Sequence, residues 1–324
     1  MNIFITGGAG FIGSHLVEYH LNKGDEVFVV DDLSTGRIEN VDLFKNNKNY
    51  RFAKGDILTW DGMDEAVAWS DRIYHMAAVV GVYRVISEPI HVLESNIAGT
   101  ERILKSVVNS GKKPRILVAS SSEVYGNGMS NTFRETDDVI IEPTAESRWN
   151  YPISKLADEA MSLSYVKAKG LPITPVRLFN VIGPRQTGRY GMVVPRFVKQ
   201  AVAGEAITVY GTGDQTRSFC DVRDIVEMFD KLISTDKSIG LIVNVGNDHE
   251  LSINTLADII RGKVNKDLDI KHVPYKEAYG QEYKDIQRRR PNLERLMSFI
   301  EFKFKWTLDE TLDYLIDHAR QGKL

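Results

Sequence analysis

The sequence predicts an α/β protein with a doubly wound parallel sheet and a smaller, interleaved C-terminal lobe. Short apolar runs alternate with longer amphipathic stretches through the first half, a glycine-rich turn follows the first apolar run, and the pattern changes beyond about Asn180. Short apolar runs separated by amphipathic helices are typical of parallel strands joined by crossover helices, which bury both faces of the sheet.

Each expected element follows from its local pattern. Apolar runs with many β-branched residues predict strands over residues 3–6, 26–30, 50–54, 72–75, 115–119, 173–177 and 241–245. Amphipathic stretches predict helices between them, including one that opens near Phe11 and two long ones over about 89–109 and 152–169. A last helix is expected from Leu308 to about Arg320, with Thr307 as N-cap and Glu310 completing a capping box.

The second half divides differently. Beyond Asn180, Gly and Pro become frequent and helices short, which indicates a lobe interleaved with the end of the sheet. We assign residues 1–179 and about 217–248 to the sheet domain, and about 180–216 and 249–324 to the lobe. No low-complexity tract or linker separates them, so the two are expected to be fused.

Composition excludes several classes of function. The 324 residues are 43% hydrophobic and 26% charged, with a net charge of −3, which gives no electrostatic footprint for nucleic acid or an anionic membrane. Cys220 is the lone cysteine, so an intramolecular disulfide and a thiolate metal cluster are both excluded. No signal peptide or membrane-spanning run is recognised. We expect a cytoplasmic protein without a bound metal, whose partners are small molecules.

The glycine-rich turn predicts a dinucleotide site. Gly7, Gly10 and Gly13 lie between the first strand and the helix that begins with Phe11 and Ile12. Glycines in this pattern allow a tight turn and close approach of the backbone to a pyrophosphate, while the helix N-terminus offers free amides and a partial positive charge. The strand before the turn and the helix after it support this interpretation over a purely packing role.

Asp31 predicts which dinucleotide binds. It ends the second strand, 18 residues after Gly13, where a carboxylate can accept hydrogen bonds from ribose hydroxyls. A phosphate on that ribose would be repelled, and the next residue is Asp32 rather than a cation. NAD is therefore expected rather than NADP.

A tyrosine and a lysine one helical turn apart predict the chemistry. Tyr151 and Lys155 share one helix face, and the ammonium would stabilise the phenolate of Tyr151 so that it can accept a hydroxyl proton. The same spacing also occurs at Tyr19/Lys23, Tyr50/Lys54 and Tyr165/Lys169. Only the Tyr151 pair follows a serine-rich strand end, where Ser121 would share the proton, because ligands bind at the carboxyl ends of such strands.

These motifs resemble the extended short-chain dehydrogenase/reductase family, in its NAD-dependent sugar-nucleotide epimerase, dehydratase and decarboxylase branch. The resemblance covers nearly the whole chain and rests on TGGAGFIGSH, DDLSTG, GDI, HMAA, SSSEVYG, YPISK, RLFNVIGPR and RRRPN. It implies a Rossmann-type fold and a homodimer that pairs the two long helices. It further implies NAD contacts from Phe11, Ile12, Asp31, Asp56, Ile57, Ala77, Asn96 and Lys155, catalysis by Ser121, Tyr151 and Lys155, and substrate contacts from Asn180, Arg217 and Arg290.

The resemblance leaves the reaction open. Glu123 follows the catalytic serine region without the preceding Asp that a 4,6-dehydratase would need, which argues against dehydration. Ser-Glu here and the Arg148-Trp149 pair resemble UDP-glucuronate decarboxylases, whereas GPRQTGRYGMVVPRF and VYGTGDQTRSF resemble epimerases. We expect 4-epimerisation of a UDP-hexose or UDP-hexuronate through a 4-keto intermediate, with UDP-glucuronate decarboxylation as the alternative. A non-catalytic NAD-binding sensor is the remote alternative, because such relatives typically lose part of the Ser-Tyr-Lys set.

Overall fold

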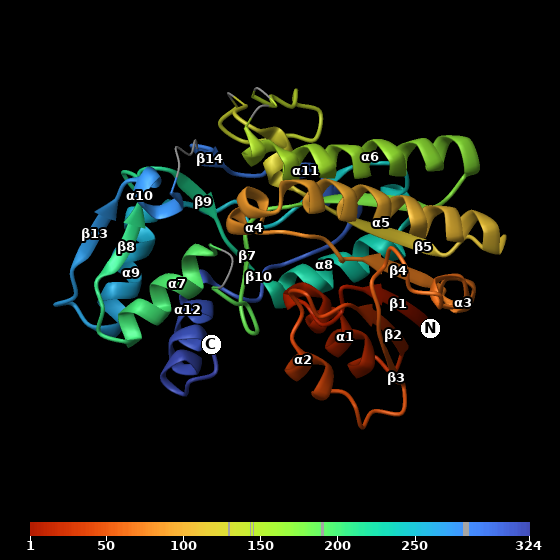
Figure 1. Ribbon diagram of the computed structural model, residues 1–324, viewed down its shortest axis with the longest axis horizontal. Coiled ribbons are helices and arrows are strands. Elements are labelled where there is room, and N and C mark those ends of the chain that lie inside the picture. Colours follow the sequence, from red (N-terminus) through yellow and green to blue (C-terminus); the bar gives the residue numbers. More distant parts are fainter. Residues whose placement is uncertain (129, 143, 145, 189–190, 281–284) are drawn as a thin grey trace.

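The computed structural model describes residues 1–128, 130–142, 144, 146–188, 191–280 and 285–324. Its centre is a seven-stranded sheet with the strand order β11-β6-β5-β4-β1-β2-β3, in which every pairing is parallel (Figure 1). The strands are β1 (Asn2–Thr6), β2 (Glu26–Asp31), β3 (Tyr50–Lys54), β4 (Arg72–His75), β5 (Arg115–Ser121), β6 (Ile173–Leu178) and β11 (Val243–Val245). The strand order reverses direction at β1, so the carboxyl ends of β1 and β4 flank the switch point at which such sheets bind ligands.

Helices cover both faces of the sheet. On one face, α1 (Phe11–Asn22) and α8 (Val222–Ser234) pack through side chains such as Leu16 and Phe229. On the other face lie α3 (Met63–Trp69), α5 (Pro89–Ser110) and α6 (Asn150–Lys169), which contribute Ile103 and Leu104 to a separate apolar cluster (Figure 1). Burial of both sheet faces explains why the strands read as nearly continuous apolar runs.

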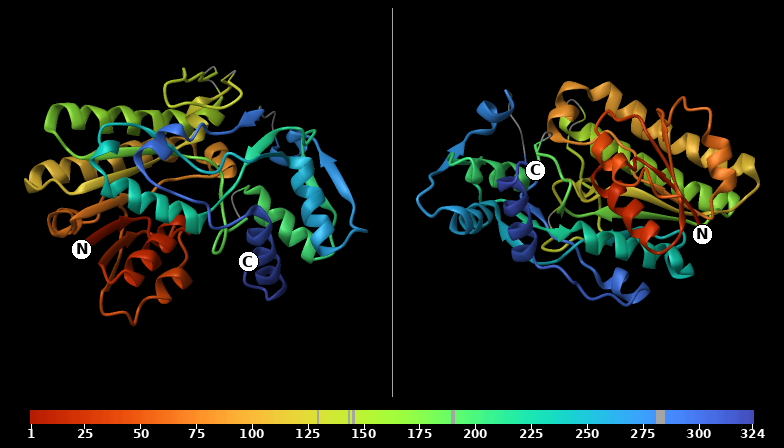
Figure 2. Two further views of the ribbon diagram at one scale, coloured as in Figure 1. Left: turned by 180° about the vertical axis from the view of Figure 1, so that it is seen from behind. Right: turned by 90° about the horizontal axis from the view of Figure 1, so that it is seen from below.

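A second hydrophobic cluster forms beside the sheet. It joins the parallel pair β8 (Ile207–Tyr210) and β13 (Ile270–Val273) to α7 (Val193–Val202), α9 (Ile253–Val264) and α12 (Leu308–Arg320). Leu256 and Ile260 lie one helical turn apart on α9 and are fully buried. Figure 2 shows these elements gathered at one end of the molecule, away from β1 to β3.

Shorter elements complete the fold. The strands are β7 (Val181–Ile182), β9 (Thr216–Ser218), β10 (Cys220–Asp221), β12 (Glu250–Ser252) and β14 (Arg288–Arg289). The helices are α2 (Ile38–Asp42), α4 (Val82–Ser87), α10 (Tyr275–Tyr279) and α11 (Glu294–Phe299), with 3₁₀ turns η1 (Ser122–Tyr125), η2 (Ser147–Trp149) and η3 (Asp236–Ser238).

Most predicted elements are confirmed to within a residue or two. Thr307 and Glu310 form the expected capping box of α12, with both reciprocal hydrogen bonds present. α6 begins at Asn150, before the predicted start at Pro152, because the first turn of a helix does not need the amide hydrogen that proline lacks. β11 begins at Val243 rather than residue 241, since Leu241 is 41% exposed and lies before the pairing with β6.

One part of the predicted lobe packs elsewhere. Leu293, Leu296 and Ile300 were expected in the lobe but are buried in the apolar cluster that includes α1 and α8. The chain therefore returns to the sheet before it reaches α12. The division of the remaining residues into two domains stays a prediction.

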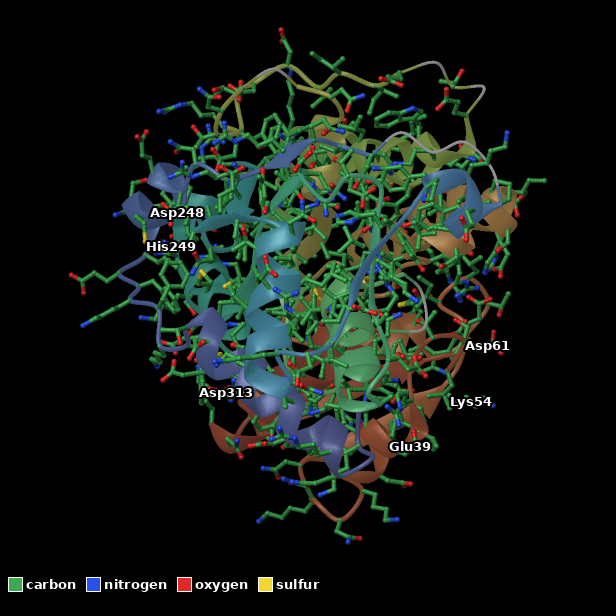
Figure 3. The ribbon with its side chains drawn as sticks, turned by 90° about the vertical axis from the view of Figure 1, so that its left-hand side faces the viewer. Glu39, Lys54, Asp61, Asp248, His249 and Asp313 are labelled. Carbon is green, nitrogen blue, oxygen red and sulfur yellow. The ribbon has the colours of Figure 1, made fainter. Side chains whose placement is uncertain are left out.

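Charged side chains cover the outside of the molecule. Glu39, Asp61 and Asp313 point outward from α2, the β3–α3 loop and α12 (Figure 3). Within the described ranges, no helix combines the length and apolar character needed to cross a membrane.

Candidate active site

A cavity of about 430 Å³ lies at the carboxyl ends of the central strands, bordered by both hydrophobic clusters. Gly7, Gly10, Phe11, Ile12 and Gly13 form one wall, as predicted. Gly7 has a φ of +71°, and a Cβ on Gly13 would lie 2.2 Å from the carbonyl oxygen of Gly7. Only glycine fits this turn, which exposes the N-terminus of α1 to the cavity and so fits a dinucleotide pyrophosphate.

Asp31 also lines the cavity and is held in place by the backbone. Its two carboxylate oxygens accept hydrogen bonds from the amides of Leu33 at 2.8 Å and Ala9 at 3.0 Å. Burial raises the pKa of this carboxyl, while the two amides act in the opposite direction. The position and polarity fit the ribose hydroxyls of NAD, and the carboxylate would repel a ribose phosphate.

The other predicted NAD contacts separate into two groups. Ala77 lines the cavity. A Cβ at position 7 would clash with the backbone nitrogen of Ala77, and Gly7 avoids this clash. Asn96 is buried behind the wall, where its Oδ1 accepts a hydrogen bond from the amide of Val79 and its Nδ2 donates to Ser154. Asn96 therefore positions the loop after β4 rather than facing the cavity.

Asp56 and Ile57 do not line the cavity. Asp56 accepts a hydrogen bond from the amide of Leu58 in an exposed turn, and Ile57 packs against the apolar cluster of α3 and α5. Their predicted contact with NAD stays a prediction.

The three predicted catalytic residues meet at the cavity. Ser121 ends β5, and Tyr151 and Lys155 lie on α6, so a strand end and a helix face bring them together. Burial raises the pKa of Tyr151 above its ordinary value and the carboxylate of Glu123 raises it further, whereas a hydrogen bond with Ser121 lowers it. Formation of the phenolate therefore depends on nearby positive charge.

Glu123 lies beside these three residues, where its carboxylate contacts two arginines. Nη1 of Arg148 donates to its Oε2 at 2.7 Å, and Nη1 of Arg289 lies 3.2 Å from its Oε1. Burial alone would raise the pKa of Glu123, but the guanidinium groups of Arg148 and Arg289 outweigh it and lower the pKa to about 2. The carboxylate is therefore ionised at neutral pH and cannot serve as a general acid.

Asn180 and Arg217 also line the cavity, and their contact with substrate stays a prediction. Nδ2 of Asn180 donates to the carbonyl of Ser218 at 2.9 Å, and its Oδ1 accepts from Arg289. Arg217 donates to the carboxylate of Asp285 at 2.8 Å. Both side chains are thus fixed by the short strands between the two clusters.

The third predicted substrate arginine, Arg290, is one of three arginines in a row, and its contact with substrate stays a prediction. Arg289 lines the cavity and Arg290 does not, because successive side chains of an extended segment point to opposite sides. Arg288 pairs with Glu250 at 2.6 Å, and Arg290 lowers the pKa of the same carboxyl, so these two share the other side. A run of three arginines does not show from the sequence which side chain faces the cavity. Arg289 is identified by its ion pair with Glu123.

Comparisons with known proteins identify the family of this chain. The model of the NAD dependent epimerase/dehydratase family matches residues 3–246. A UDP-N-acetyl-alpha-D-glucosaminuronate decarboxylase of Bacillus cytotoxicus is 37% identical over 98% of this chain and 97% of its own length. UDP-glucuronic acid decarboxylase 1 of Xenopus tropicalis is 33% identical over 98% of this chain and 72% of its own length.

A solved structure shows the same architecture. UDP-glucuronic acid 4-epimerase of Bacillus cereus, in complex with UDP-glucuronic acid and NAD, aligns with a TM-score of 0.88 at 26% identity, covering 99% of this chain and all of that one.

The chain belongs to the NAD dependent epimerase/dehydratase family. It is an NAD-dependent enzyme that modifies a nucleotide sugar, which confirms the predicted cofactor and class of activity and rules out the non-catalytic sensor. Within the described ranges, no group of three His, Cys, Asp or Glu side chains is placed to hold a metal ion.

Proposed function

We propose that this enzyme decarboxylates a UDP-linked hexuronate through a ketone at C4 of the sugar. The observation that carries the proposal is the ionised Glu123 carboxylate held between Arg148 and Arg289, beside Ser121 and Tyr151. This arrangement supplies fixed positive charge close to the reacting sugar but no acidic carboxyl group.

The first step needs the predicted catalytic residues. Tyr151 accepts the proton of the C4 hydroxyl, Ser121 hydrogen-bonds the same oxygen, and the ammonium of Lys155 stabilises the phenolate. When bound, NAD would supply the hydride acceptor for this oxidation and the hydride for the final reduction. Gly7, Gly13 and Asp31 would hold it, as their geometry fits the pyrophosphate and ribose.

The second step follows from the chemistry of a β-keto acid. The C5–C6 bond breaks and its electron pair enters the C4–C5 enolate, while C6 leaves as carbon dioxide. Tyr151 holds the proton that it accepted and Ser121 donates a hydrogen bond, so both stabilise the negative charge at O4. C5 then takes a proton, and reduction of C4 restores the hydroxyl.

The arginines support recognition of an acidic substrate. Arg217 and Arg289 line the cavity, and Nε of Arg289 is buried without a hydrogen-bond partner among the described residues. Guanidinium groups recognise carboxylate and phosphate oxygens by paired hydrogen bonds. Glu123 balances part of this charge and orients Arg148 and Arg289, which keeps the site assembled before substrate enters.

The relatives favour decarboxylation over the 4-epimerisation that we expected first. Full-length similarity is greatest, among the relatives described above, to an enzyme named for a 2-acetamido hexuronate. The low pKa of Glu123 also argues against dehydration, which requires a carboxylic acid to protonate the leaving hydroxyl. We therefore place UDP-N-acetylglucosaminuronate first and UDP-glucuronate second among substrates, and we further propose that the enzyme is cytoplasmic.

Epimerisation of a UDP-hexuronate is the second candidate. The similarity in fold to a UDP-glucuronic acid 4-epimerase favours it, since both reactions begin with the same C4 oxidation. They differ afterwards: an epimerase must let the ketone turn over without losing the carboxylate.

The experiment is to incubate the enzyme and NAD with UDP-N-acetylglucosaminuronate, UDP-glucuronate, UDP-glucose and UDP-N-acetylglucosamine in separate reactions. Proton NMR and mass spectrometry identify the products, and trapped carbon dioxide is quantified. We expect a pentose product and carbon dioxide from a hexuronate. A galacto-configured product that retains the carboxylate would show that the enzyme is an epimerase and not a decarboxylase. Tyr151→Phe serves as the inactive control.

A further inference from the structure

A buried carboxylate without a role in the reaction above lies against the catalytic lysine. Asp158 follows Lys155 by three residues on α6, and its Oδ2 lies 3.1 Å from Nζ. The two side chains are 0% and 3% exposed. Lys155 lines the cavity and Asp158 does not, so the carboxylate lies behind the ammonium as seen from the substrate.

Few other groups face this pair. Thr100 on α5 lies close enough to lower the pKa of Asp158, although burial dominates and raises it. His75 on β4 contacts the Thr100 hydroxyl at 3.1 Å, but burial and then Lys155 lower its pKa to about 3, so the imidazole is neutral. Glu159 on α6 raises the pKa of Asp158, yet its own charge is paired with Arg177 at 2.8 Å.

Lys155 and Asp158 therefore form a buried ion pair on the same helix as the proton-accepting phenol, and Glu123 is the other carboxylate that raises the pKa of Tyr151. A buried carboxylate is costly unless it is paired, and Oδ1 of Asp158 has no hydrogen-bond partner among the described residues. The ammonium has three N–H donors. One is directed to Asp158, which leaves two for the cavity and fixes the position of Nζ.

We propose that Asp158 is a positioning residue that holds the ammonium of Lys155 at the back of the cavity and, by balancing its charge, sets the pH range in which Tyr151 accepts a proton. The inference rests on the proposed proton-accepting role of Tyr151. Asp158 touches neither the cavity nor the reacting atoms and acts through Lys155.

The direction of the effect follows from the charges. A nearby ammonium such as that of Lys155 would favour the phenolate of Tyr151. The negative charge of Asp158 opposes it and, after burial and the carboxylate of Glu123, raises the pKa of the phenol. Removing the carboxylate charge lets the phenolate form at lower pH. The acidic limb of the profile of kcat/KM against pH should then move down by roughly one unit.

The test compares Asp158→Asn with the wild-type enzyme on the hexuronate that the enzyme decarboxylates. Asp158→Ala removes the same charge without adding a buried amide, and alanine suits a helix, so it replaces the first variant if that one fails to fold. Ser162→Ala is the matched control, because its hydroxyl bonds only the backbone carbonyl of Asp158. We expect the limb to shift in both Asp158 variants and to stay in place in the control.

A second readout separates this proposal from the proposed function. Ultraviolet absorbance titration of the NAD-bound protein, with Tyr151→Phe subtracted, follows the Tyr151 phenolate without substrate. A lower midpoint in Asp158→Asn supports the inference even if no hexuronate is decarboxylated. Unchanged midpoints and superimposable pH profiles would overturn it, as would an equal shift in Ser162→Ala.

Discussion

Arg148 donates a hydrogen bond from Nη1 to Oε2 of Glu123 at 2.7 Å, in the same cavity as Ser121 and Tyr151. The Arg148 side chain is 8% exposed and the Glu123 side chain 21% exposed, so the pair is only weakly screened by water. Because Glu123 is also paired with Arg289, one carboxylate links the loop before α6 to the short strand β14. The substrate side of the cavity is therefore assembled by charge from segments far apart in the sequence.

Arg289 lines the cavity and its neighbour Arg290 does not, so variants of the two residues can be compared directly. Arg289→Ala should raise KM for a UDP-hexuronate by at least about tenfold, since a charged hydrogen bond to substrate is lost. Arg290→Ala removes the same side chain from outside the cavity and should leave KM within about twofold. Steady-state kinetics measures both, and an inverted order would restore Arg290 as the substrate residue.

The nucleotide preference depends on one carboxylate. The wild-type enzyme should bind NAD more tightly than NADP, and Asp31→Ala should reduce that difference by about tenfold because the repulsion of the ribose phosphate is lost. Calorimetric titration with each dinucleotide gives the ratio. Asp32→Ala, at the exposed neighbour, is the control. Equal affinity of the wild-type enzyme for both dinucleotides would contradict the assignment.

The Tyr-x-x-x-Lys pattern supplies its own control on one helix. Tyr151→Phe should lower kcat by roughly 10²–10⁴-fold while NAD still binds, because only the proton acceptor is removed. Tyr165→Phe changes the decoy pair on α6, whose ring packs in the apolar cluster of α3 and α5, and should retain nearly full turnover. Near-normal rates in Tyr151→Phe would refute its catalytic role.

The oligomeric state is a further prediction. A homodimer that pairs α5 and α6 would cover Ile90, which begins α5 and is 70% exposed in the single chain. Light scattering after gel filtration should give twice the chain mass, and Ile90→Asp should shift the mass toward one chain. Leu43→Asp makes the same change at a site that is 60% exposed beyond α2 and should leave the mass unchanged. A single-chain mass for the wild-type protein would exclude the dimer.

Periodic and local signals were predictable from the sequence. The apolar runs, the glycine turn and the Thr307 cap depend on residues close together in the chain. The sheet and α12 are therefore confirmed, and the glycine turn lines the cavity. The side on which Arg289 points depends instead on the register of β14 against β9, which involves residues more than 70 positions apart. No local pattern carries that information.

The burial of residues behind the cavity could not be predicted from the sequence either. Asp158 lies on a helix that also carries Glu159 and three lysines, and a sequence alone does not say that this carboxylate is fully buried. Asn96 illustrates the same limit, since its hydrogen bond with the amide of Val79 is visible only in the fold, while its contact with NAD stays a prediction. Positions that act through another side chain become visible only when packing is known.

The last prediction concerns acid stability. Glu123 has a pKa of about 2 in the folded protein, below its ordinary value of 4.5, so its pairing stabilises the fold fully above the ordinary value. This contribution is lost as the pH falls from 4.5 toward 2, because protonation ends the attraction to Arg148 and Arg289. Glu123→Gln removes the charge at every pH and leaves two arginines without their counter-ion, which should cost up to about 3–5 kcal/mol near neutral pH. Urea unfolding of both proteins at several pH values measures the difference in unfolding free energy, which should shrink steadily through the acidic range. A difference that stays constant with pH would show that Glu123 stabilises the fold by packing rather than by charge.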